Sequence, residues 1–290
     1  WRCPIRCASL AWSAPSHSKR GNSQLQFGTR VSTGEGGVHV ISTLSMPLHT
    51  NSASRLKALL SKALGESDGT QVMEVWARLF GIVEDNQNKK AALVSERLRW
   101  MYHETESISK QMKATGYSDH LYSGAIANIE HALSTMILPG SWNQAKQYIK
   151  RETILALDFC SEILPDEESQ ISEEDISCIR NLVSELRELL QASELPTRLI
   201  DLIQHHIDLI SRALDGYPIS GAKTLREAAR TGLGELIEIK EAVEASRTAP
   251  EISKLGETWK KVNSVADAAL KIEKLAQLGQ KAWAAIEGLI

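Results

Sequence analysis

Apolar side chains recur at intervals of three and four residues along most of the chain after residue 50. This spacing places them on one face of an α-helix and is typical of helices that pack together. The clearest stretch is 172–214, where two such rows follow one another with Pro196 between them. Because proline is tolerated in the first turn of a helix, we expect a second helix to begin there and to form an antiparallel hairpin with the first. The rows comprise Ile176, Ile179, Val183, Leu186, Leu190, Leu195, Leu199, Leu202, His206, Leu209 and Ala213.

The remaining chain after residue 50 predicts further helices, and it contains no alternating apolar and polar run of the kind that a strand requires. Prolines lie between the periodic runs, and Gly216 with Pro218 is expected to end the second helix of the hairpin. We therefore predict an all-α fold, a multi-helix bundle of antiparallel helices, with an N-terminal subdomain over 50–165 and a C-terminal subdomain over 166–290. The other expected helices lie near 54–64, 70–80, 86–114, 118–137, 141–150, 152–163, 220–245 and 250–290.

Residues 1–49 lack either period and differ from the rest of the chain in charge. Residues 1–45 hold five Lys or Arg and one acid, whereas the remainder holds 28 Lys or Arg and 35 acids. Three interpretations fit this segment: a transit-type peptide, a disordered tail, or non-native upstream sequence ahead of a true start at Met46. Residues 1–49 are therefore predicted to be a disordered leader or non-native upstream sequence, and in none of the three interpretations do they build the fold.

Composition narrows the possible classes of function. A net charge of −3 gives no overall basic surface for nucleic acid or anionic lipid. The four cysteines include no CxxC pair, which argues against a disulfide framework or a zinc site and favours a reducing cytoplasm. No apolar run reaches the roughly 18 residues that a membrane span requires. The sequence therefore predicts a soluble cytoplasmic protein with no transmembrane segment.

Two stretches nearly match phosphate-binding and hydrolase motifs. Residues 216–224 resemble a P-loop, but Ala222 stands where the lysine should follow the second glycine. Residues 65–69 match the GxSxG pattern of a nucleophile elbow, which works at a turn from strand to helix. Because helices are expected on both sides of each stretch, we interpret both as turns. No cofactor is predicted.

Histidine positions argue against a metal site. No histidine follows a glutamate by three residues, which is the spacing that places both ligands on one helical face in di-iron bundles. His205 and His206 are adjacent, so a helix directs them to different faces. His206 belongs to the apolar row, and we expect it in the core, with His205 at the surface.

Arg198 and His205 on the polar face of the second hairpin helix form an Arg-x6-His pair. This pair resembles the Arg-x4–6-His signature of HEPN-type RNases, which are helical proteins of toxin and defence systems. The resemblance covers two residues and the fold class, and Leu199 stands where the family often has a polar residue. It implies metal-independent RNA cleavage across a dimer, with Arg198 and His205 as the catalytic residues. The other interpretation is a solvated helix face.

By elimination, the sequence favours a non-enzymatic helical interaction or scaffold protein that binds a protein partner or a second copy of itself. Small residues along the last periodic run would let a partner helix approach closely. Nucleic acid is expected only under the RNase alternative. A third hypothesis is a peripheral membrane effector that uses the C-terminal amphipathic helix. The predicted interaction seam comprises Val262, Ala269, Ala276, Gly279, Trp283 and Ile286.

Overall fold

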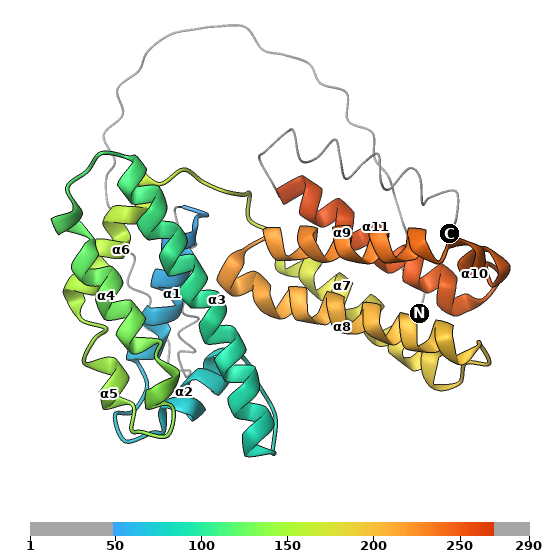
Figure 1. The fold of residues 1–290 in the computed structure, drawn as a ribbon, viewed down its shortest axis with the longest axis horizontal. Coiled ribbons are helices and arrows are strands. Elements are labelled where there is room, and N and C mark those ends of the chain that lie inside the picture. The colour runs from blue at the N-terminus through green and yellow to red at the C-terminus, as the bar shows by residue number, and fades with distance from the viewer. Residues whose placement is uncertain (1–48, 270–290) are drawn as a thin grey trace, which may run out of the picture. The chain divides into compact units, whose positions relative to one another are not determined.

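The structure is a computed structural model that describes residues 49–269, and Figure 1 shows their arrangement. All the secondary-structure elements in this range are helices, which confirms the all-α prediction. The predicted leader, apart from its last residue, lies outside the described residues, as do residues 270–290. The first group of helices comprises α1 (Ser52–Leu64), α2 (Val72–Leu79), α3 (Gln87–Ala114), η1 (Asp119–Leu121), α4 (Ser123–Ala132), η2 (Thr135–Ile137), α5 (Asn143–Lys146) and α6 (Arg151–Ile163).

The first helix is fixed at its start by Asn51. Its side-chain oxygen accepts a hydrogen bond from the Ser54 amide at 3.1 Å, and the Ser54 hydroxyl accepts one from the Asn51 amide at 3.1 Å. This reciprocal cap satisfies amides that a helix cannot pair internally. The Asn51 amide group also donates to the carbonyls of Ser161 and Leu164, which ties α1 to the end of α6.

Two predicted helices are shorter or more broken than expected. The run 118–137 is divided into η1, α4 and η2, and the run 141–150 retains only the short α5. Ser134 accepts the Met136 amide, a local bond that competes with continuation of the helix. The chain between η2 and α5 instead caps the start of α2, because the carbonyls of Leu138 and Gly140 accept hydrogen bonds from the first amides of α2.

The second group comprises α7 (Glu173–Gln191), α8 (Thr197–Ser220), α9 (Lys223–Glu238), α10 (Lys240–Ala245) and α11 (Pro250–Ala269). Helices α7 and α8 pack together across a short connection, as the predicted hairpin requires, and α9 and α11 lie beside them (Figure 1). Ser172 caps α7 by accepting the Asp175 amide at 3.0 Å.

The predicted end of α8 was wrong. The helix continues past Gly216 and includes Pro218 before it ends at Ser220. Proline removes one helical hydrogen bond, but here it lies in the last turn, where buried neighbours hold the chain. Ile219 is fully packed, and the Tyr217 hydroxyl accepts the Ile171 amide at 3.2 Å. Gly221, at a φ of 72°, then turns the chain into α9.

Buried apolar side chains form two clusters. One is built from α1 to α6 and the segments between them, and the other from α7 to α11. Ile219, at the end of α8, belongs to the first cluster, so α8 contributes to both. The clusters meet near residue 165, although the described residues, 49–269, belong to one unit by their contacts. The division into two subdomains stays a prediction.

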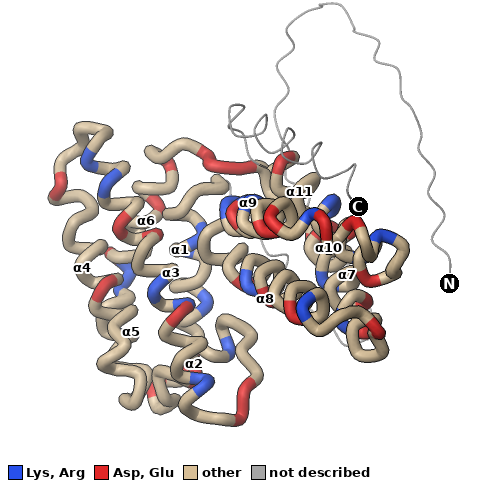
Figure 2. The backbone as a smooth tube through the Cα atoms, turned by 45° about the vertical axis from the view of Figure 1, so that its right-hand side comes forward, with Lys and Arg blue, Asp and Glu red and all other residues tan. Residues whose placement is uncertain are grey.

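Charged residues of both signs are interspersed along the described helices, as Figure 2 shows. Neither sign is confined to one group of helices. None of the helices between residues 49 and 269 combines the length and the hydropathy needed to cross a membrane.

Candidate functional site

Helix α3 carries a polar and aromatic row beside its apolar one. Arg97, Trp100 and Glu104 recur at intervals of three and four and face the second group of helices. The Arg97 guanidinium lies 4.2 Å from the Trp100 ring centroid, and its Nη2 lies 2.6 Å from the Asp215 carboxylate on α8. Burial, only partly offset by Asp215 and Glu96, lowers the pKa of Arg97 below its ordinary value. This row holds the Trp100 indole beside α8.

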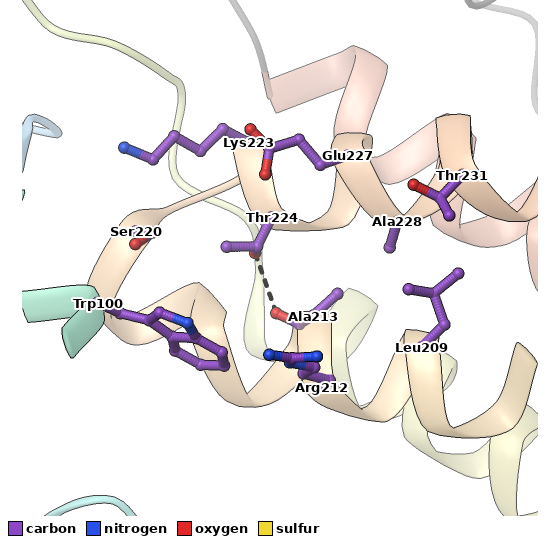
Figure 3. A pocket seen from close by; sticks show the side chains of 10 residues that line it. All are labelled: Trp100, Leu209, Arg212, Ala213, Ser220, Lys223, Thr224, Glu227, Ala228 and Thr231. Atoms are coloured by element: carbon purple, nitrogen blue, oxygen red, sulfur yellow. Dashed lines mark hydrogen bonds between the residues drawn. The ribbon is translucent and has the colours of Figure 1, made fainter. Parts of the chain in front are cut away.

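The Trp100 ring forms one wall of a hollow of about 290 Å³ between α8 and α9, drawn in Figure 3. We call it the Trp100 hollow. Its apolar lining comes from Leu209 and Ala213 on α8 and from Ala228 on α9, and its polar lining includes two cations, one carboxylate and three hydroxyl groups. The complete lining is Trp100, Leu209, Arg212, Ala213, Ser220, Lys223, Thr224, Glu227, Ala228 and Thr231.

Two small features shape the hollow. A β-carbon at Gly216 would lie 3.1 Å from the Trp100 ring and 3.2 Å from the Thr224 methyl group, so glycine lets the indole approach α8 closely. The Thr224 hydroxyl donates to the Ala213 carbonyl at 3.0 Å, as the dashed line in Figure 3 shows, and lies 2.9 Å from the Gly221 carbonyl. The first turn of α9 is thereby fastened to α8.

A buried set of charges lies next to the hollow, and we call it the Arg55 cluster. The Arg55 guanidinium on α1 lies 2.6 Å from Glu167, 3.3 Å from Glu168 and 3.5 Å from Glu104. Lys223 on α9 reaches the same Glu104 carboxylate at 2.5 Å. The Arg55 cluster therefore joins α1, α3, α9 and the connection before α7.

The surroundings shift the pKa values of the two most buried carboxylates of the Arg55 cluster in opposite directions. Burial tends to raise the pKa of Glu104, but Lys223, Ser52 and Arg55 outweigh it and hold that pKa below its usual value. Burial raises the pKa of Glu168, and Arg55 and the Ala222 amide offset it only in part. Glu168 accepts the hydrogen bond of the Ala222 amide at the start of α9, so this carboxylate serves as a helix cap.

The structure places Arg198 and His205, the predicted catalytic pair of the RNase alternative, on the same side of α8. Both are exposed, and His205 Nε2 lies 3.2 Å from the Glu235 carboxylate on α9. Arg198 lines a separate hollow with Ile237 and residues 238–242. Seven residues of helix separate the two backbone positions by roughly 10 Å along the axis.

His206 lies in the core, as predicted, and His205 at the surface. The His206 imidazole is fully buried and meets the Trp259 indole edge-on at a centroid distance of 5.6 Å. Neither of its ring nitrogens has a hydrogen-bond partner among the described residues, and Nε2 lies 3.8 Å from Glu235. Burial, with a smaller contribution from His205, lowers the pKa of His206 to about 4.

Within residues 49–269, no group of three His, Cys, Asp or Glu side chains is arranged to bind a metal ion. Both near-miss motifs have helices on each side, but the turn expected over residues 216–224 is confined to Gly221 and Ala222. Residues 65–69 form the connection from α1 to α2, and residues 216–224 span the end of α8 and the start of α9.

The predicted interaction seam lies only partly in the described residues. Val262 and Ala269 are 0% and 4% exposed and pack inside the second hydrophobic cluster. They are therefore used in packing within the chain and leave no surface for a partner. Ala276, Gly279, Trp283 and Ile286 lie outside the described residues, and the seam prediction rests on them alone.

Sequence reasoning missed Trp100, Glu227 and Glu235. Trp100 left a signal, because Arg97, Trp100 and Glu104 repeat with the spacing of a packed helix face. Glu227 and Glu235 left none, since an acidic residue on a helix surface reads the same in sequence whether or not it lines a hollow.

No protein-family model, curated protein or solved structure matches this chain.

Proposed function

We propose that this chain is a non-enzymatic helical interaction protein and that the Trp100 hollow receives a segment of its protein partner. One observation carries the proposal: an indole and an arginine frame an apolar-floored hollow between two helices. Tryptophan and arginine dominate the binding energy of protein interfaces, and grooves between helices commonly receive side chains of a partner.

The groups in the Trp100 hollow are better placed for contact than for proton transfer. Lys223 is paired with Glu104, and Arg212 with Glu96 on α3. The Thr224 hydroxyl donates a hydrogen bond to the Ala213 carbonyl on α8. A general base or nucleophile needs a free lone pair near the reacting group, and Lys223, Arg212 and Thr224 are already engaged. The Glu227 carboxylate is not engaged, but among the described residues it makes no hydrogen bond to a hydroxyl group of the lining that it could activate.

Site-specific cross-linking tests this proposal. A photo-reactive residue replaces Thr231, which is exposed and lines the hollow, and the full chain is irradiated in extract of its source cells. We expect a discrete adduct that disappears when Trp100→Ala is added. The matched control is Tyr102→Ala on the same helix, because Tyr102 is 39% exposed and does not line the hollow. An adduct that survives Trp100→Ala refutes the proposed surface.

Self-association through the C-terminal residues is the form of partner binding that the sequence suggests. Because Val262 and Ala269 are core residues, the deletion that tests it begins after Ala269. We expect the oligomeric mass measured by sedimentation to fall when residues 270–290 are removed. An unchanged mass would exclude this segment as the contact between copies.

A second candidate function is the metal-independent RNase. The observation that favours it is the contact between His205 and Glu235, because a carboxylate can orient an imidazole for proton transfer. RNA cleavage by the purified chain should be lost in Arg198→Ala and His205→Ala. The control is His103→Ala, an exposed histidine that also contacts a glutamate. Cleavage that is absent in the wild type, or equal in all variants, removes this candidate.

The membrane hypothesis requires an apolar helix face that is open to lipid. The described part of the last helix, α11, instead buries its apolar face against α7 and α9. Vesicle binding that weakens with salt would still support the hypothesis through the remaining C-terminal residues.

A further inference from the structure

Each of the three cations around the Trp100 hollow pairs with a carboxylate. Arg97 pairs with Asp215 at 2.6 Å, Lys223 with Glu104 at 2.5 Å, and Arg212 with Glu96. These pairs cross between α3 and the helices α8 and α9, so they also hold the walls of the hollow together. A ligand that enters the hollow therefore meets cations whose charge is already neutralised.

Glu227 is the surplus charge. Its carboxylate is exposed, lines the hollow, and has no hydrogen-bond or ion-pair partner within the part of the chain that the structure describes. Figure 3 shows this carboxylate directed towards the Lys223 side chain, with Leu209 and Ala228 further along the same hollow on the two facing helices. The hollow thus combines an apolar lining with one unneutralised negative group.

We propose that the Trp100 hollow binds a basic side chain, a lysine or arginine of the partner, and this inference rests on the proposed interaction function. The aliphatic stem of such a side chain lies along Leu209 and Ala228, and its cation pairs with Glu227. Lysine and arginine are the residues that bury an apolar stem while keeping a charged head in water. The Trp100 indole adds an apolar wall to the same space.

An acidic side chain fits this hollow less well. It would have to draw Arg212 away from Glu96, or Lys223 away from Glu104, whose side chain is 4% exposed. Glu104 would then keep only Arg55, at 3.5 Å, as a charged partner. Removing one partner from a buried ion pair leaves an uncompensated charge, which is strongly unfavourable. The ion pair between Lys223 and the buried Glu104 therefore disfavours an anionic ligand in the hollow.

Three small probes with the same chain length test the inference: n-butylammonium, 1-butanol and butanoate. Each is titrated into the full chain while the indole ¹H–¹⁵N signal of Trp100, assigned with Trp100→Phe, is followed by NMR. We expect n-butylammonium to shift this signal at millimolar concentration and to bind more tightly than 1-butanol, with butanoate weakest. Added salt should reduce the advantage of the cation.

The decisive variant is Glu227→Gln, with Glu238→Gln as the matched control. Both residues are exposed glutamates on α9, but only Glu227 lines the Trp100 hollow. Glu227→Gln should weaken n-butylammonium binding about two- to fivefold, the range of an exposed ion pair, and leave 1-butanol binding unchanged. Because Glu227 has no partner to lose, the variant should stay folded, and its NMR spectrum shows whether it does.

The results separate this inference from the proposed function. Equal or tighter binding of butanoate, or no effect of Glu227→Gln, overturns the preference for a cation. If none of the probes shifts the Trp100 signal, the hollow does not admit an aliphatic stem and the inference is overturned as well. The cross-linking at Thr231 decides independently whether a partner occupies this surface.

Discussion

Acid should destabilise the fold through His206. Its pKa is about 4 in the folded chain and about 6.5 when unfolded, so the unfolded chain binds the proton more tightly. The contribution of the neutral imidazole is therefore complete above pH 6.5 and is lost as the pH falls towards 4. The free energy of unfolding should fall by about 2 kcal/mol at pH 5 and by about 3 kcal/mol at the acid limit, at about 1.36 kcal/mol for each pKa unit.

The assay is urea unfolding followed by far-ultraviolet circular dichroism at several pH values between 7.5 and 5. Glu104 and Asp175 also have lowered pKa values, so their contributions to stability also decrease as the pH falls. The pH dependence of His206→Leu is therefore subtracted from that of the wild type. The difference isolates His206, because the carboxylates are common to both chains.

Equal loss of stability in the wild type and in His206→Leu would refute the reasoning. It would mean that protonated His206 finds a partner, for which Glu235 at 3.8 Å is the nearest candidate. If His206→Leu does not fold, the NMR titration of the His206 ring in the wild type gives the same answer. A transition above pH 6 would contradict a buried neutral imidazole.

Further predictions concern glycines and cooperativity. Gly232→Ala should cost about 1–3 kcal/mol in thermal unfolding, because its β-carbon would overlap the Trp259 indole, whereas Gly234→Ala has open space and should be neutral or stabilising by up to about 1 kcal/mol. Gly221→Ala should destabilise more than Gly116→Ala: both have positive φ, but only at Gly221 would the β-carbon lie 2.6 Å from a carboxylate. Unfolding of the two hydrophobic clusters should be a single transition, seen as coincident curves from tryptophan fluorescence and circular dichroism; two separate transitions would contradict this.

Periodicity predicted the helical class and the positions of the long helices because burial selects one face of each helix. The predicted helix 86–114 matches α3 (Gln87–Ala114), and Asn86 and Gly116 mark its ends in the sequence. The hairpin of α7 and α8 follows from the same spacing. Where a helix is long and one of its faces is buried, local sequence and tertiary packing agree.

The features that the sequence did not reveal depend on contacts between distant residues. Pro218 is accepted in α8 because Tyr217 and Ile219 on either side of it are held by the connection before α7 and by the first hydrophobic cluster. Glu168 caps α9 from 54 residues away. The Trp100 hollow exists only when α3 lies against α8 and α9. Such pairings cannot be read from spacing along one helix.

Because of the Arg55 cluster, we expect the helices before and after residue 165 to unfold together as one cooperative unit. Arg55 belongs to the first group of helices, and its partners Glu167 and Glu168 precede α7. Unfolding either group alone would leave some of these buried charges without partners, at about 3–5 kcal/mol for each broken pair. A domain is typically stable by only about 5–15 kcal/mol. The free energy needed to unfold one group alone is therefore comparable to the stability of the whole domain. Unfolding of both hydrophobic clusters together is then favoured over partial unfolding.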